Sequence, residues 1–239
     1  MTYQNASVLI TGASRGIGRS IALSFAAQTN RQLILLARGI EGLEETKKLA
    51  LAAGASGCTL IACDATDEQD ILNVKLPADV PTPGILVNNA GSYLYKKATE
   101  TTDQEFRQQI DLNLFTSVNV TRRFLPDLLA LDRSLIVNIC SVGALHGLPE
   151  SGAYSAAKHA LLGYTRSLRA ELLQTNVGVT AINLGQTHSP SWDESAMSPD
   201  ELINPTDVAN LLVVLSSFSP RTLAEEVLLQ PQHGRVDPM

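Results

Sequence analysis

A serine, a tyrosine and a lysine that could act together in proton transfer stand within one short stretch of the chain. Tyr154 follows Ser141 by thirteen residues, and Lys158 follows Tyr154 by four. A spacing of four places Tyr154 and Lys158 on one face of a helix, one turn apart. A free phenol titrates near pH 10, and a neighbouring ammonium lowers that pKa toward the range useful in catalysis. We therefore expect a tyrosine made acidic by a lysine, with the Ser141 hydroxyl delivered from a strand end to hold the oxygen being protonated.

The N-terminal half supplies a site where a dinucleotide could bind. A Tyr-x-x-x-Lys pair also occurs by chance on surface helices, so the pair indicates catalysis only if the chain also has such a site. Val8 to Ile10 form an apolar run typical of a buried strand, and this run leads directly into the glycine-rich residues 11–18. Three glycines there leave the backbone bare at the start of a helix. Strand, glycine turn and helix in this order favour a nucleotide site.

The end of the second expected strand, residues 33–37, favours NADP(H) over NAD(H). NAD-binding sites place an acidic residue here to bind the adenosine ribose, whereas this chain has Ala37 followed by Arg38. With Arg15 from the glycine turn, two guanidinium groups could flank a 2′-phosphate, for which their geometry is well suited. The alternative is that both arginines are merely solvated.

Polar residues follow the next two expected strands. Asp64 comes directly after the strand of residues 59–63, where it could accept a bond from an adenine amino group or cap the helix that begins near Asp67. Asn89 and Gly91 follow the fourth strand. An asparagine there can bridge loose backbone groups of neighbouring strands, and a glycine clears space beside a cofactor.

A buried asparagine is expected in the second half of the chain. A helical pattern runs from Asp103 to Leu131, and Asn113 lies within it among apolar neighbours. A polar side chain in such a setting is either satisfied locally or functional. The strand that follows, residues 134–141, delivers Ser141 to the carboxyl edge of the sheet, where ligands of open α/β sheets bind.

Length and composition indicate one domain spanning residues 1–239 and exclude several classes of partner. A chain of 239 residues with a net charge of −6 argues against nucleic acid or an anionic membrane as a partner. No apolar run is long enough to cross a bilayer, and the N-terminus lacks the features of a secretory signal. The three cysteines have no metal-ligand spacing, so we expect no metal and reduced thiols in the cytoplasm.

Two further segments have expected roles. One would cover the substrate, and the other could contact a partner subunit. Residues 185–204, which include Pro190 and Trp192, are long for a connection and would form a substrate lid. The helix from about Gly152 to Gln174 is apolar on more than one side. A single buried stripe does not require so many apolar positions, so one face of this helix could pack on a partner subunit.

Taken together, these residues resemble the short-chain dehydrogenase/reductase family over nearly the whole chain. The matching motifs are Thr-Gly-Ala-Ser-Arg-Gly-Ile-Gly at residues 11–18, Asn-Asn-Ala-Gly at residues 88–91, Asn113, Ser141 and Tyr154-x-x-x-Lys158. The resemblance implies an α/β fold of the doubly wound Rossmann type, with a seven-stranded, mostly parallel sheet and helices on both faces. It also implies a homodimer or homotetramer built through the long helices.

The same resemblance implies a role for each residue in carbonyl reduction by NADPH. Tyr154 is the general acid, and Lys158 both lowers its pKa and binds the nicotinamide ribose. Ser141 polarises the carbonyl, and Asn113 holds a water in a proton relay. The other residues implied in cofactor binding are Gly12, Ser14, Arg15, Gly16, Ile17, Gly18, Arg38, Asp64, Asn89, Ala90, Gly91, Gly185 and Thr187.

The chain departs from the family after the sixth expected strand. The family usually has Pro-Gly there, and this chain has Leu184 before Gly185, which leaves the path of the lid and its nicotinamide contacts open. Asp237 near the C-terminus is similar to an acid of sepiapterin-reductase-like members that holds the pterin ring, and the alternative is a solvated tail. Asp237 and Trp192 are the candidate substrate residues.

Three functions are compatible with this sequence. The leading one is NADPH-dependent reduction of a ketone to an alcohol by hydride transfer, with a sepiapterin-type ketone as one option. The second is reduction of a 3-oxoacyl group on an acyl carrier protein, which would need a basic docking face such as Arg122, Arg123 and Arg133 could form. The third, of another class, is an NADP(H)-binding regulator without turnover.

Overall fold

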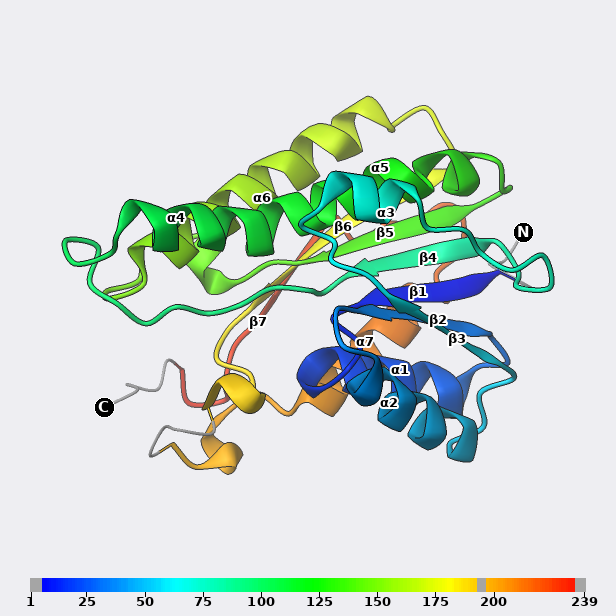
Figure 1. Ribbon diagram of the computed structural model, residues 1–239, viewed down its shortest axis with the longest axis horizontal. Coiled ribbons are helices and arrows are strands. Elements are labelled where there is room, and N and C mark those ends of the chain that lie inside the picture. The colour runs from blue at the N-terminus through cyan, green and yellow to red at the C-terminus, as the bar shows by residue number, and fades with distance from the viewer. Residues whose placement is uncertain (1–5, 193–196, 235–239) are drawn as a thin grey trace.

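The computed structural model describes residues 6–192 and 197–234, which form a seven-stranded sheet with helices on both faces (Figure 1). All neighbouring strands run parallel, in the order β3-β2-β1-β4-β5-β6-β7. This arrangement confirms the expected doubly wound α/β fold. The strands are β1 (Ser7–Thr11), β2 (Leu33–Ala37), β3 (Cys58–Ala62), β4 (Pro83–Asn88), β5 (Ser134–Ile139), β6 (Val177–Leu184) and β7 (Glu226–Leu229).

The sheet separates two apolar cores because its strands present alternate side chains to opposite faces. Val8 and Ile10 of β1 lie in one core, and Leu9 lies in the other. Helices α1 (Gly16–Gln28), α2 (Ile40–Ala52) and α7 (Pro205–Leu215) cover the first face (Figure 1). Helices α3 (Glu68–Leu72), α4 (Asp103–Ile110), α5 (Thr116–Leu129) and α6 (Gly152–Glu171) lie on the other.

The order of the strands reverses between β1 and β4. The chain passes from β1 to β2 and β3 in one direction, then returns to β4 beside β1 and continues outward to β7. In open α/β sheets, a crevice forms at the carboxyl ends of the strands at such a switch point. The glycine turn follows β1, Asn89 follows β4 and Ser141 follows β5, so all three reach this edge of the sheet.

The long helix expected from Asp103 to Leu131 is not continuous. It divides into α4, a π-helical turn at Asp111–Phe115 and α5. The start of α4 is fixed by a capping box, in which Thr102 and Glu105 bond to each other's backbone amides. A π-helical turn interrupts the regular helical repeat, and such turns are frequent at functional sites. Asn113 lies in this turn.

Helix α6 ends at Glu171 rather than at Gln174, and several of its apolar residues are buried within the chain. Leu161 and Leu162 belong to a small third core, and Leu168 packs in the core beneath α5 and α6. Burial in its own chain therefore accounts for part of the apolar character of α6, whereas Ala156, Ala160 and Tyr164 are only partly buried. The expected homo-oligomer stays a prediction.

The segment after β6 is closed at its base by backbone hydrogen bonds. The Ile203 amide donates to the Gln186 carbonyl at 2.9 Å, and the His188 amide donates to the Ile203 carbonyl at 3.0 Å. Strand β6 extends through Leu184, which pairs with Leu229 of β7. The leucine in place of the family proline therefore continues the strand and brings its side chain to the carboxyl edge.

None of the helices among the described residues combines the length and the apolar character that crossing a bilayer requires. No three His, Cys, Asp or Glu side chains of the described residues come together as metal ligands.

Candidate active site

Two adjoining cavities form a continuous crevice along the carboxyl edge of the sheet. The tyrosine cavity, of about 410 Å³, is lined by the Ser141, Tyr154 and Lys158 group. The glycine cavity, of about 450 Å³, follows the turn between β1 and α1. The two cavities share the residues Ile17, Asn89, Gly91, Ser189 and Ser191. The crevice thus lies where the reversal of strand order predicts a ligand.

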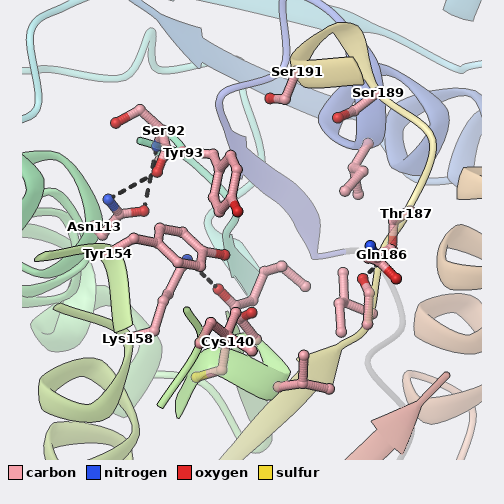
Figure 2. A pocket seen from close by; sticks show the side chains of 18 of the residues that line it. Ser92, Tyr93, Asn113, Cys140, Tyr154, Lys158, Gln186, Thr187, Ser189 and Ser191 are labelled. Carbon is pink, nitrogen blue, oxygen red and sulfur yellow. Dashed lines mark hydrogen bonds between the residues drawn. The ribbon is translucent and has the colours of Figure 1, made fainter. Parts of the chain in front are cut away.

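Tyr154 and Lys158 lie on one side of the tyrosine cavity (Figure 2), and Ser141 lines the same cavity. The buried Ser141 oxygen accepts from the Gly143 amide at 3.0 Å, and the Ser141 hydroxyl also bonds to the Tyr154 phenol. The buried Lys158 Nζ donates to the Ile139 carbonyl at 3.0 Å and lies 5.8 Å from the centre of the Tyr154 ring. Strand β5 and the first turns of α6 therefore bring together the three groups that the sequence singles out.

The pKa of Tyr154 shifts in the direction opposite to the expectation. Burial raises the pKa of the Tyr154 phenol to about 12, although the hydrogen bond with Ser141 lowers it in part. Burial also lowers the pKa of the Lys158 ammonium. The expectation that Lys158 makes Tyr154 acidic is therefore wrong, because loss of solvation is the largest effect on both groups. Tyr154 is held in its protonated form, which is the form that donates a proton.

Asn113 is buried, and its side chain is satisfied by its neighbours (Figure 2). Its Nδ2 donates to the Ser92 carbonyl at 3.0 Å and to the Gln109 carbonyl at 3.1 Å, and its Oδ1 accepts from the Ser92 amide at 3.3 Å. A Cβ atom on Gly91 would lie 2.7 Å from this Oδ1, so the close approach requires glycine. Asn113 thus ties the π-helical turn to the segment after β4, at the wall of the tyrosine cavity.

The glycine turn forms a cradle in which Gly12 and Gly18 leave no room for a side chain. Gly12 has a φ of +64°, and a Cβ atom there would lie 3.0 Å from the Ala90 Cα. A Cβ atom on Gly18 would collide with the Gly12 carbonyl and lie 2.7 Å from the Asn89 Nδ2. That Nδ2 in turn donates to the Thr11 carbonyl at 3.0 Å, which locks the ends of β1 and β4 together. The bare backbone fits the close approach of a pyrophosphate.

The N-terminus of α1 is free to bind an anion. Arg15 occupies the capping position without a side-chain cap, and the first turn contains no acidic residue. The positive end of the helix dipole and the free amides there favour a phosphate. Arg15 and Arg38 are exposed and line the glycine cavity, and neither forms an ion pair with another described residue. Their charges therefore remain available to a further phosphate.

Asp64 lies at the same cavity but does not cap a helix. Its Oδ1 accepts from the Thr66 amide at 3.0 Å and from the Thr66 hydroxyl at 2.7 Å. Helix α3 is capped instead by Asp67, which accepts from the Gln69 and Asp70 amides. The capping alternative for Asp64 is therefore wrong, and its role beside an adenine stays a prediction.

The remaining expected residues divide between the two cavities. Ser14 and Ala90 line the glycine cavity. Gly185, Thr187 and Trp192 line the tyrosine cavity, so the segment after β6 covers that side of the crevice. Asp237 lies outside the described residues.

Several cavity residues are not indicated by the sequence motifs. Tyr93, His146, Leu148, Gln186 and Gln230 all line the tyrosine cavity. Tyr93 follows Asn89 by four residues, and His146 follows Ser141 by five. Their nearness to strand ends was a usable signal, but loop paths cannot be followed from residue types alone.

Comparison with known proteins identifies the relatives of this chain. The family model described as short chain dehydrogenase matches residues 6–199. A fatty acyl-CoA reductase from Acinetobacter baylyi is 31% identical over 226 residues, which are 90% of this chain and 74% of that protein.

Two solved structures are similar in fold and sequence. A variant of actinorhodin polyketide ketoreductase with NADPH has a TM-score of 0.85 and 26% identity, covering 95% of this chain and 97% of that one. A 3-oxoacyl-(acyl-carrier protein) reductase from Brucella melitensis has a TM-score of 0.85 and 27% identity, covering 95% of this chain and 91% of that one.

Proposed function

This chain belongs to the short-chain dehydrogenase/reductase family of oxidoreductases, and on that premise we propose that it reduces a ketone to an alcohol with NADPH. The observation that carries the proposal is the contact between the Tyr154 phenol and Ser141, beside the buried Lys158 ammonium. These groups line a cavity that merges with a glycine cradle suited to a dinucleotide. A proton donor therefore stands next to a site for a hydride donor.

Two parts of the glycine cavity would hold the cofactor. The cradle of Gly12, Gly16 and Gly18 with the first amides of α1 would bind the pyrophosphate. Arg15 and Arg38 would bind the 2′-phosphate that distinguishes NADP(H) from NAD(H). When bound, NADPH supplies the hydride.

The chain's own residues supply the proton and stabilise the charge that its transfer creates. Because the Ser141 oxygen already accepts from the Gly143 amide, its hydroxyl hydrogen can be donated to the substrate oxygen or to Tyr154. Tyr154, protonated at neutral pH, transfers its proton to the substrate oxygen as the alcohol forms. Ser141, whose hydrogen bond lowers the pKa of the phenol in part, favours the phenolate that remains, and Lys158 would bind the nicotinamide ribose. Asn113 would hold the water through which Tyr154 regains a proton.

The test measures the oxidation of NADPH through its loss of absorbance, with diacetyl and acetophenone as the ketone substrates. Tyr154→Phe removes the proton donor and keeps the ring, so we expect turnover to fall roughly 10²- to 10⁴-fold, the usual contribution of a general acid. NADPH binding, measured by fluorescence, should be retained. Tyr95→Phe is the matched control, because Tyr95 is exposed and lines neither cavity.

Equal activity of wild type and Tyr154→Phe would contradict the role of the phenol. Tight NADPH binding by a wild type that reduces neither ketone would favour the non-catalytic regulator instead.

The acyl-carrier alternative receives less support from the arrangement of its basic residues. Arg122 and Arg123 each pair with a carboxylate of the same chain, and Arg133 donates to backbone carbonyls. Arg133 also precedes β5, so it lies at the edge of the sheet opposite to the crevice. These arginines are poorly placed to guide an acidic carrier toward the tyrosine cavity. Comparing turnover of sepiapterin with that of an acetoacetyl thioester separates this alternative from the pterin option, which depends on Asp237.

A further inference from the structure

A strap of chain, residues 92–98, is bound to the start of the helix that carries the catalytic tyrosine. The Lys96 amide donates to the Glu150 carbonyl at 2.6 Å, and Lys96 forms a parallel bridge with Ser151. Glu150 has a φ of 53°, a conformation uncommon outside glycine that persists only where the surroundings fix it. The strap and the first turn of α6 are thus held in one fixed arrangement.

Tyr93 of the strap contacts the ring of Tyr154 directly (Figure 2). The two ring centres are 4.9 Å apart, and the ring planes meet at 82°. Edge-to-face pairs of this kind are favourable because the positive edge of one ring meets the negative face of the other. The Tyr93 hydroxyl lies 2.8 Å from the Ser151 Oγ. Ser151 is buried, and among the described residues its hydroxyl bonds to Tyr93 and does not cap α6.

The position of Tyr93 relates it to the substrate rather than to the cofactor. Tyr93 lines the tyrosine cavity and is absent from the lining of the glycine cavity. Its side chain is 40% exposed, so one part of the ring supports Tyr154 and another part faces the open cavity. Nearby electrostatic interaction with Tyr93 also contributes to the raised pKa of Tyr154.

We propose that Tyr93 is a positioning residue: its ring and its bond to Ser151 hold the Tyr154 ring in place, and its open face limits the groups that fit beside the substrate carbonyl. This role rests on the ketone reduction proposed above. It extends that function by identifying a residue that sets both the geometry of proton transfer and the size of the substrate.

Kinetics with acetophenone and the larger acetonaphthone test both parts of the role. Tyr93→Ala removes the edge-to-face contact, so we expect kcat for acetophenone to fall about tenfold. The same change opens the cavity wall, so the preference for acetonaphthone over acetophenone should rise. Tyr93→Phe keeps the ring and loses one hydrogen bond, so we expect a fall in kcat of about threefold with the size preference unchanged.

The bond to Ser151 can be tested from its other end. Ser151→Ala should lower kcat to the same degree as Tyr93→Phe, and the double variant should lower it no further, because both changes remove one interaction. Tyr95→Phe is the matched control: the Tyr95 hydroxyl also bonds to a residue before α6, Glu150, but the side chain does not line the cavity. We expect wild-type kinetics from this control. Unchanged kcat and size preference in both Tyr93 variants would overturn the proposal.

A second measurement does not depend on turnover. In protein with carbon-13-labelled tyrosine rings, the Tyr154 signal is assigned by its absence from Tyr154→Phe and followed by NMR as the pH rises to about 11. Wild type and Tyr95→Phe should show a protonated Tyr154 throughout. In Tyr93→Ala the Tyr154 ring is more exposed to water, so the titration of the Tyr154 phenol should begin at lower pH. If the wild type reduces no ketone, the proposed function fails, and this titration alone decides the role of Tyr93: an identical curve in all three proteins refutes it.

Discussion

Tyr154 combines a raised pKa with a hydrogen bond to Ser141, and the protonation state of its phenol decides whether it can donate or accept a proton. Reduction of a carbonyl uses the protonated phenol, whereas oxidation of an alcohol uses the phenolate as a base. A phenol with a pKa of 10.0 is already protonated at neutral pH, and the rise of the Tyr154 pKa to about 12 extends this acid form to more alkaline pH. The acid form suits the reduction proposed above.

The pH dependence of turnover tests this conclusion. With acetophenone and saturating NADPH, we expect kcat for reduction to stay level from about pH 7 to about pH 10, because the donor stays protonated. Oxidation of the product alcohol should accelerate over the same range, as the base form becomes more populated. Stopped assays at fixed ionic strength measure both. A loss of reduction with a midpoint near pH 7 would instead show that Lys158 lowers the phenol pKa, as its spacing first suggested.

We propose that Arg38 carries the choice between the two dinucleotides. It is exposed, lines the glycine cavity and has no ion-pair partner among the described residues. Arg38→Asp replaces a phosphate ligand with a group that repels phosphate and can bind a ribose, so NADPH affinity should fall at least about tenfold while NADH affinity rises. Fluorescence titration measures both. Arg221→Asp makes the same charge change far from the crevice and should alter neither affinity. An unchanged preference in Arg38→Asp would mean that the arginine is only solvated.

At the residue scale, spacing predicts which groups meet but not their protonation. The interval of four between Tyr154 and Lys158 fixes their common face from the sequence alone. The pKa of Tyr154 depends on burial and on Tyr93, which lies in a loop 61 residues earlier in the chain and has no motif of its own. Desolvation is a property of the packed neighbourhood, so no local pattern reports it.

At the scale of elements, the turn between β1 and α1 is packed so tightly that no side chain fits at Gly18. The carbonyl of Gly12 and the side-chain amide of Asn89 occupy the space that a Cβ atom on Gly18 would need. The Asn89 side chain cannot easily move aside, because its Nδ2 donates a hydrogen bond to the Thr11 carbonyl. The tight packing joins the ends of two strands to the first turn of a helix, and so it places the anion site.

Gly18→Ala tests this packing. The added methyl group should force the turn apart, with a cost of about 1–3 kcal/mol in the free energy of unfolding and a fall in NADPH affinity of about tenfold or more. Thermal denaturation and fluorescence titration measure the two effects. Gly147→Ala is the control, because a Cβ atom there meets no other atom within 4 Å. Unaltered stability and affinity in Gly18→Ala would show that the cradle is not packed as described.

The elements themselves were predictable to different degrees. Strands β1 and β2 are continuous apolar runs bounded by polar or glycine residues, so their positions follow from the sequence. The π-helical turn at Asp111–Phe115 does not, because its flanks keep an ordinary helical pattern and the extra residue leaves no compositional mark. What covers the apolar faces of α6 does not follow from the sequence either, because periodicity reveals that a face is apolar but not what buries it.

At the scale of the whole molecule, exposed apolar surface gathers on α4 and the π-helical turn. Phe106 is 42% exposed and Phe115 is 44% exposed. They line a shallow hollow together with Ile110, and its rim carries both acidic and basic side chains, including Asp103 and Arg107. An apolar centre with opposite charges around it can pair with its own copy about a two-fold axis. We propose that the homo-oligomer forms through this surface rather than through α6.

Light scattering after size-exclusion chromatography tests this surface. Wild type should have two or four times the mass of one chain, whereas Phe115→Lys, which places a charge in the apolar centre, should reduce the mass to that of a single chain. Such a buried, unpaired charge is costly enough to dissociate an interface of this kind. Leu173→Lys is the matched control, since Leu173 is 69% exposed just beyond α6 and outside the hollow. It should keep the wild-type mass. A wild type of single-chain mass would rule out the oligomer, and an oligomeric Phe115→Lys would place the interface elsewhere.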